Sequence, residues 1–255
     1  MPSILQFRFE AECAGLAAEA RINDIPVDRD PTGVPRISQN ALNHWLIEGE
    51  NRLSVSLGRL DPASALERYE CEVLARDSAI GSASEERVVG YRWPGGASLP
   101  TWPGREVACL TFHAYLGAGR WRWLDAGSGP IAESDRLRLL ARVAELHRAT
   151  SARQLEVVLQ QLTTQHQEMA RAHGADPDAY RDRQSRTLEA YMSHDRFRLE
   201  PLELSRLKLE PRADGRLVFV TDQDGRAPVR GSAGAVAFQL PSVFSRLEEG
   251  WTLVR

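Results

Sequence analysis

The sequence predicts two domains, an antiparallel β-sandwich over residues 1–128 and an α+β domain over residues 129–255 in which three helices precede an antiparallel meander sheet. Two observations predict this fold class. Hydrophobic residues alternate with polar ones in the first half, and they recur every three or four residues once the chain passes residue 130 or so. A chain of 255 residues is also long enough to bury two cores of ordinary size.

The composition is that of an ordinary globular protein, with 42% hydrophobic and 26% charged residues. A net charge of -3 provides no positive field, so we expect neither a nucleic-acid nor a membrane partner. The first residues lack a basic region followed by an apolar run, and no stretch reaches the roughly 18 apolar residues of a membrane span. We therefore expect a soluble, cytoplasmic protein.

Strands of the first domain follow from period-two alternation between Gly, Pro and Asp turns. The alternating runs cover residues 5–13, 53–57, 69–75 and 110–116, and residues 86–93 and 121–124 add further strands. Six or seven short strands favour a sandwich of two antiparallel sheets.

The three cysteines, Cys13, Cys71 and Cys109, are odd in number and lie within these strands. We expect reduced structural thiols on apolar faces, although a Cys13–Cys71 bridge between neighbouring strands stays open.

One stretch of the first domain carries a family resemblance. Residues 20–27 form a hairpin pattern, and Gly49, Asn51, Leu53 and Val55 follow after a loop. This stretch resembles the hairpin and G-x-N-x-L-x-V strand entry of jelly-roll accessory modules found in many carbohydrate-active proteins. The resemblance implies a sandwich fold, and modules of this kind bind sugars in some proteins and act as spacers in others.

Residues 91–104 form an aromatic loop with two Trp-Pro pairs, a composition that excludes a helix. Exposed rings here would make a surface for a partner protein or a sugar. Alternatively, Trp93 and Trp102 fold back as a plug over one end of the sandwich, and this is the alternative we favour. The candidates for partner or sugar binding are Tyr91, Trp93, Trp102, Trp121 and Trp123.

Start and stop signals divide residues 132–196 into three helices. Ser134 and Asp135 precede the first helix. The capping-box pair Ser151 and Gln154 precedes a longer second helix, which stops at Gly174. Asp176 and Pro177 begin the third helix. This region holds ten arginines and ten acidic residues, and we expect them to pair within the helices.

After His194 the pattern returns to strands, at residues 197–209, 216–221, 236–240 and 247–254 with Asp-Gly turns between them. This element order and the final Gly250-Trp251 strand resemble the α+β domains of the nuclear-transport-factor-like superfamily and their cystatin-like relatives. The resemblance implies a cone between helices and sheet, which in such proteins is sometimes an enzyme pocket and often a binding or dimerisation scaffold.

Motifs of phosphate loops, hydrolases and metal sites are missing from the sequence, so we expect no cofactor and no metal. His147, His166 and His173 lie on or near helix faces that also carry apolar residues. They are the candidates to line a pocket, although a structural role is the stronger expectation.

Three functions fit this sequence. The first is a non-enzymatic protein that binds another protein, of the inhibitor, immunity or adaptor type. The second is carbohydrate binding or processing through the aromatic loop, with a glycan as partner. The third is a small-molecule enzyme that uses the cone, with a histidine and a carboxylate as acid and base.

Overall fold

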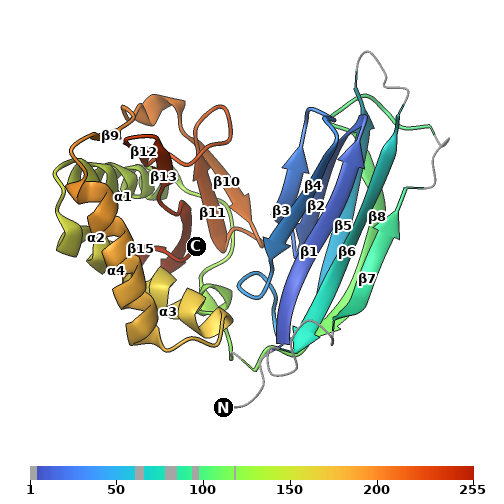
Figure 1. Cartoon of the computed structure of the whole chain (residues 1–255), viewed down its shortest axis with the longest axis horizontal. Coiled ribbons are helices and arrows are strands. Elements are labelled where there is room, and N and C mark those ends of the chain that lie inside the picture. The colour runs from blue at the N-terminus through green and yellow to red at the C-terminus, as the bar shows by residue number, and fades with distance from the viewer. Residues whose placement is uncertain (1–4, 61–65, 78–84, 94–97, 118) are drawn as a thin grey trace. The chain divides into compact units, whose positions relative to one another are not determined.

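The structure, a computed structural model, describes residues 5–60, 66–77, 85–93, 98–117 and 119–255 (Figure 1). The chain divides into two compact units, Met1–Arg120 and Trp121–Arg255, here called unit 1 and unit 2. Unit 1 is a sandwich of two antiparallel sheets, and unit 2 has helices followed by antiparallel sheets. The predicted fold class is therefore confirmed.

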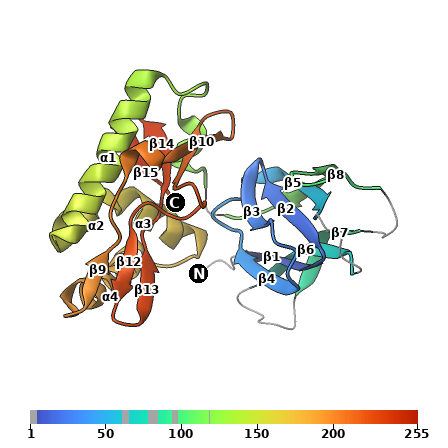
Figure 2. The same cartoon turned by 90° about the horizontal axis from the view of Figure 1, so that it is seen from above.

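Unit 1 contains two four-stranded sheets, which Figures 1 and 2 show stacked as two layers. Sheet A consists, in spatial order, of β4 (Arg36–Ala41), β1 (Leu5–Ala14), β6 (Arg68–Asp77) and β7 (Glu86–Arg92). Sheet B consists of β3 (Ile25–Asp30), β2 (Leu16–Ile22), β5 (Gly49–Arg59) and β8 (Arg105–Ala114).

The alternating residues fill the space between the two sheets. Phe7 and Phe9 of β1 and Leu53 and Val55 of β5 are all buried, while their sequence neighbours are more exposed. The period-two prediction for these strands is confirmed, because one face of each sheet is covered by the other sheet.

The cysteines are all free thiols. Cys13 and Cys71 lie on the neighbouring strands β1 and β6, and burial raises the pKa of each to about 11. Both thiols are therefore protonated and unreactive at neutral pH. Cys109 is exposed rather than on the apolar face, because it alternates with the inward-facing Leu110 and Phe112 on β8.

Gly49 and Asn51 turn the chain into β5 as predicted. Gly49 has a φ of +92°, a backbone conformation that favours glycine. The buried Asn51 amide accepts a hydrogen bond from the Ile47 N–H at 2.9 Å and donates to the carbonyls of Ile47 and Gly49. The side chain thus replaces the backbone partners that the sharp turn removes.

A charged network joins β3 of sheet B to β4 of sheet A. Arg36 Nη2 donates to both carboxylate oxygens of Asp28 at 2.8 and 2.9 Å, and its Nε donates to Asp30 at 3.0 Å. Burial by itself raises the pKa of Asp30, but hydrogen bonds from Thr32 and Arg36 outweigh it and hold the pKa below its ordinary value. Both aspartates are buried, so this network fixes how the two edge strands meet.

Unit 2 has four helices and two sheets (Figures 1 and 2). The helices are α1 (Glu133–Ser151), α2 (Leu155–Gln161), α3 (Thr163–Ala172) and α4 (Pro177–Ser193), and short 3-10 helices cover Arg122–Asp125 and Leu204–Arg206. One sheet has the order β10 (Lys208–Arg212), β11 (Leu217–Thr221), β14 (Val243–Leu247), β15 (Gly250–Leu253), and the other β13 (Val236–Gln239), β12 (Arg230–Ala233), β9 (Phe197–Leu199).

The core of unit 2 lies between helices and strands. Leu139, Val143 and Leu146 of α1 pack in one cluster with Val218 and Phe244 of the sheet. Their spacing of three and four residues places them on one face of α1, as the periodicity predicts.

Helix boundaries differ from the prediction at two places. The capping box at Ser151 and Gln154 is wrong, because α1 continues through Ser151 and Gln154 makes no side-chain cap. The predicted second helix is two helices that meet at Leu162, where the Thr163 hydroxyl donates back to the Leu159 carbonyl at 3.1 Å. By contrast, the Asp176 cap is confirmed, since its side chain accepts from the Ala179 N–H at 2.9 Å.

Residues 121–124 were predicted as a strand of the first domain, with the boundary after residue 128. Arg122–Asp125 instead form a 3-10 helix, and the chain divides between Arg120 and Trp121. The Trp121 ring is buried because the guanidiniums of Arg171 and Arg255 lie 5.1 and 5.0 Å from its centroid.

A buried ion pair lies next to this ring. Arg255, which follows β15, donates through Nη1 to Glu168 of α3, and each side chain is 2% exposed. The second Glu168 oxygen accepts from the Arg122 N–H at 2.7 Å. Burial lowers the pKa of Arg255, and the Glu168 charge opposes that shift. The pair therefore ties α3 both to the end of the sheet and to the 3-10 helix.

Within the part of the chain that the structure describes, no helix is long and apolar enough to cross a membrane.

Candidate functional site

The aromatic candidates are mostly inside the two units. Trp93 is 8% exposed, Trp121 is 1% exposed and Trp123 is 2% exposed. Tyr91 and Trp102 are half-buried, and residues 94–97 of the predicted aromatic loop lie outside the described residues. Three of the five rings are thus covered, and their contribution to a binding surface stays a prediction.

The backbone of the aromatic loop packs against β5. The Trp102 N–H donates to the Arg59 carbonyl at 3.0 Å, and Gly104 approaches Leu57 so closely that a Cβ atom there would collide with its carbonyl oxygen. This part of the loop extends sheet B.

The three candidate histidines do not converge. His166 of α3 is 5% exposed, its Nδ1 has no partner among the described residues, and burial together with the Arg181 charge lowers its pKa to about 4. Burial and the Arg183 charge also lower the pKa of His173, which follows α3. His147 of α1 donates through Nε2 to the Glu200 carbonyl at 2.9 Å.

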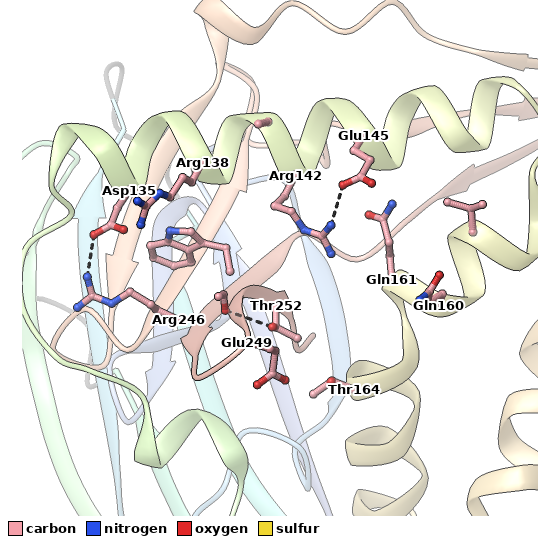
Figure 3. Close-up of a pocket in the computed structure, with 14 residues that line it drawn as sticks. Asp135, Arg138, Arg142, Glu145, Gln160, Gln161, Thr164, Arg246, Glu249 and Thr252 are labelled. Atoms are coloured by element: carbon pink, nitrogen blue, oxygen red, sulfur yellow. Dashed lines mark hydrogen bonds and ion pairs between the residues drawn. The ribbon is translucent and has the colours of Figure 1, made fainter.

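Unit 2 has a cavity of about 720 Å³ between α1 and β15, here called the α1 pocket (Figure 3). It lies where the predicted cone between helices and sheet would be, and the three histidines are not part of its lining. The polar residues that line it are Asp135, Arg138, Arg142 and Glu145 of α1, Gln160 and Gln161 of α2, Thr164 of α3, and Arg246, Glu249 and Thr252 of the β14–β15 hairpin.

The α1 side of the pocket follows from helical spacing. Asp135, Arg138, Arg142 and Glu145 are three or four residues apart, so they share one face of α1 beside the apolar face that enters the core. Figure 3 shows Arg142 extending from α1 into the middle of the pocket, between Arg246 at one end and Gln161 at the other.

The opposite side is the hairpin of β14 and β15. Gly250 has a φ of +105°, which lets the chain turn directly into Trp251. Trp251 is 7% exposed and belongs to the apolar core cluster, so it forms a rigid part of the pocket wall.

The three acidic residues of the pocket each form an ion pair with an arginine. Arg246 donates to Asp135 at 2.7 Å, Arg142 donates to Glu145 at 2.7 Å, and Glu249 accepts from Arg122 at 2.7 Å. Arg122 is not part of the lining. Every acidic residue of the pocket therefore already has a basic partner.

Arg138 is different from the other charged residues of the pocket. Among the described residues it has no hydrogen-bond or ion-pair partner, and it is exposed. Its guanidinium offers five N–H donors, so the pocket has a spare donor for an anionic group.

The two hydroxyl groups that line the pocket both have hydrogen-bond partners. The Thr164 hydroxyl accepts from Arg122 at 3.2 Å, and the Thr252 hydroxyl donates to the Gly250 carbonyl at 3.2 Å. Neither hydroxyl lies next to a histidine or a free carboxylate that would activate it. Among the described residues, no three His, Cys, Asp or Glu side chains gather as a metal site.

A second hollow in unit 2, here called the α4 groove, has a volume of about 500 Å³. It is lined by Arg183, Arg186, Thr187, Ala190 and Tyr191 of α4, by His194, and by Ala233 and Val236 of the β12–β13 hairpin.

The floor of the α4 groove is apolar and firmly supported. Val236 is 55% exposed, although it is a large hydrophobic residue. The Tyr191 ring stacks on Phe238 with centroids 5.4 Å apart, and Phe238 stacks on Phe197 at 5.3 Å. Gly234 has a φ of +65°, and a Cβ atom there would lie 3.2 Å from the His194 ring, so glycine permits the close approach of the hairpin to His194.

The rim of the α4 groove is basic. Arg183 lies over the Tyr180 ring at 5.1 Å, and Arg186 bonds weakly to the Asp182 carbonyl of its own helix at 3.4 Å. Neither arginine has an acidic partner within the described residues. The predicted pairing of charges within helices is therefore wrong for α4. Asp182 and Glu189 stand four residues before and three residues after Arg186, at ion-pair spacing, yet no ion pair with Arg186 forms among the described residues.

Comparisons with family models, with curated proteins and with solved structures gave no match.

Sequence reasoning did not identify the residues that line either hollow. The lining of the α1 pocket extends from Asp135 to Thr252, and that of the α4 groove from Arg183 to Val236, so no local spacing marks them. The sequence does carry one feature that belongs to each hollow. For the α1 pocket it is the Gly250-Trp251 pair, and for the α4 groove it is the recurrence at helical spacing of Arg183, Thr187, Ala190 and His194.

Proposed function

We propose that the protein is a non-enzymatic binding protein, of the inhibitor, immunity or adaptor type, that holds an acidic segment of a partner protein in the α4 groove. The observation that carries this proposal is an exposed apolar floor next to two arginines without acidic partners. Exposed apolar surface bordered by charge is typical of protein interaction sites.

The chemistry of the groove defines the bound segment. One large apolar side chain of the partner covers Ala190 and Val236, and an acidic side chain within a few positions of it pairs with Arg183 or Arg186. A volume of about 500 Å³ holds a single large side chain and the backbone on either side of it, rather than a whole helix face. Because the Tyr191–Phe238 stack fixes the floor, binding needs little rearrangement of the groove.

The two other functions have less support. Sugar stacking needs exposed rings, and the ring of Trp93 is buried. An enzyme in the cone needs an acid or a base, and each carboxylate of the α1 pocket already pairs with an arginine. The finer family resemblances stay proposals. The jelly-roll resemblance of unit 1 rests on the hairpin and on the strand-entry motif from Gly49 to Val55, and the nuclear-transport-factor-like or cystatin-like resemblance of unit 2 rests on element order and the Gly250-Trp251 strand.

The test uses random linear peptides displayed on phage and selected on the full chain. We expect the selected peptides to share an acidic residue within a few positions of a large apolar one. Arg183→Glu should weaken the selected peptide about tenfold or more, the effect of losing a charge pair next to an apolar contact. Affinity is measured by fluorescence anisotropy of the labelled peptide.

Arg148→Glu is the matched control, because Arg148 is exposed on α1 and its side chain has no ion-pair partner among the described residues. It should leave the affinity unchanged. Val236→Glu tests the floor and should also weaken binding. Selected peptides without acidic residues, or equal losses in Arg183→Glu and Arg148→Glu, would contradict the proposal.

A further inference from the structure

We propose that the α1 pocket is a binding site for a small organic oxyanion, a carboxylate or a phosphate carried on an apolar body. This site is separate from the α4 groove and does not depend on the proposed function. The proposal rests on the size of the cavity, on its charge balance and on the apolar groups that line it.

The size fits a small molecule. Ligand pockets of proteins have volumes of roughly 300–1,000 Å³, and the α1 pocket has about 720 Å³. Its walls come from α1, α2, α3 and the β14–β15 hairpin, and α1, α2 and the hairpin pack on one core. The cavity is therefore formed before a ligand arrives.

The charge balance selects an anion. The lining has three arginines and three acidic residues, but Arg122 from outside the lining neutralises Glu249. The pairs Asp135–Arg246 and Arg142–Glu145 cancel, so Arg138 remains as one positive charge in excess.

A second guanidinium lies within reach of the same anion. Arg142 is one helical turn from Arg138, about 6 Å along the axis of α1. Its partner Glu145 is 40% exposed and comes from the same helix, so this ion pair is weak and easily exchanged. A bound oxyanion would accept hydrogen bonds from both arginines, whose planar guanidiniums suit carboxylate and phosphate groups.

The apolar part of the ligand has its own contacts. Ala141, Val157 and Trp251 also line the pocket. Water in contact with these groups is released when an apolar chain or ring replaces it. An inorganic ion alone would leave this surface uncovered, and an uncharged apolar molecule would leave Arg138 without a partner.

The experiment compares octanoate, octyl phosphate and octanol, which share one apolar body and differ in the head group. Binding to the full chain is measured by titration calorimetry. We expect octanoate or octyl phosphate to bind at least about tenfold more tightly than octanol, the effect of a charge-assisted hydrogen bond in a pocket. Whichever head group binds more tightly identifies the carboxylate or the phosphate as the natural one.

The variant Arg138→Gln should reduce the affinity for the anionic probe to that for octanol, and Arg142→Gln should weaken it as well. Arg148→Gln, beyond the pocket lining near the end of α1, is the control and should change nothing. Because Arg138 is exposed and has no partner within the described structure, its replacement leaves the fold intact. The proposal is overturned if octanol binds as tightly as the anions, if none of the probes binds, or if Arg138→Gln binds like the wild type.

Discussion

The buried pair of Arg255 and Glu168 allows a quantitative prediction for unit 2. Both side chains are 2% exposed, so neither charge is solvated by water. Replacing Glu168 by glutamine removes the opposite charge with which the buried Arg255 guanidinium pairs. Loss of one partner of a buried pair costs about 3–5 kcal/mol, and we expect the free energy of unfolding to fall by that amount.

The double variant measures the interaction energy between the two charges separately from the cost of losing either side chain. Arg255→Met alone leaves the Glu168 carboxylate buried, with the Arg122 N–H at 2.7 Å and the Arg171 guanidinium at 3.7 Å as remaining partners, so its cost should lie at the lower end of the same range. Glu168→Gln with Arg255→Met removes both charges and should cost less than the sum of the two, by about 3 kcal/mol.

The assay is urea unfolding followed by the helical ellipticity band, because the α-helices of the described chain all lie in unit 2. Glu203→Gln is the control, since the Glu203–Arg206 pair is exposed and should contribute less than about 1 kcal/mol. If Glu168→Gln costs no more than Glu203→Gln, the guanidinium of Arg255 is solvated after all and the reasoning is refuted.

Two further predictions concern His166 and Gly104. The pKa of His166 is about 4 in the folded chain against an ordinary 6.5, so between these values the unfolded chain binds a proton that the folded chain does not. Stability should therefore fall from pH 6.5 to pH 4 by up to about 3 kcal/mol from this group, and His166→Gln should remove that part of the pH dependence in urea unfolding. Gly104→Ala should destabilise unit 1 by about 2 kcal/mol or more, because φ is +74° and the new Cβ would collide with Leu57. Hydrogen exchange of the β5 amides measures this, and Gly117→Ala, with positive φ but open space, should cost clearly less; equal costs would contradict the argument.

Strands with one fully buried face could be predicted from the sequence, and so could the edge strands β7 and β8, but the edge strand β4 could not. β1, β5 and β6 alternate because each is covered on one side by the other sheet. β4 was missed because it is an edge strand of mostly polar residues, whose large apolar residue, Ile37, is 73% exposed. Its place is fixed by Arg36 and the aspartates of β3, a contact that periodicity cannot show.

Residues 121–124 show a second limit of the same reasoning. The pattern Trp-Arg-Trp-Leu fits a strand whose residues are alternately buried and exposed, yet Arg122–Asp125 form a 3-10 helix. Trp121 is buried by guanidiniums from Arg171 and Arg255, both far along the chain. Tertiary contacts of this kind override local alternation, and they also explain why an aromatic candidate for a binding surface lies inside unit 2.

Each unit contains a half-buried or buried arginine that joins two layers of the fold through buried carboxylates. Arg36 joins the edge strands of sheets A and B, and Arg255 joins the end of β15 to α3. Apolar contacts alone are non-directional and permit several registers of similar energy. A buried guanidinium tolerates only the arrangement in which its carboxylate is in reach, because every other register leaves a buried charge unpaired. We infer that these two residues serve to select one packing of the layers. Arg138 of the α1 pocket and Arg183 and Arg186 of the α4 groove have no such partner among the described residues and are the ones available to ligands.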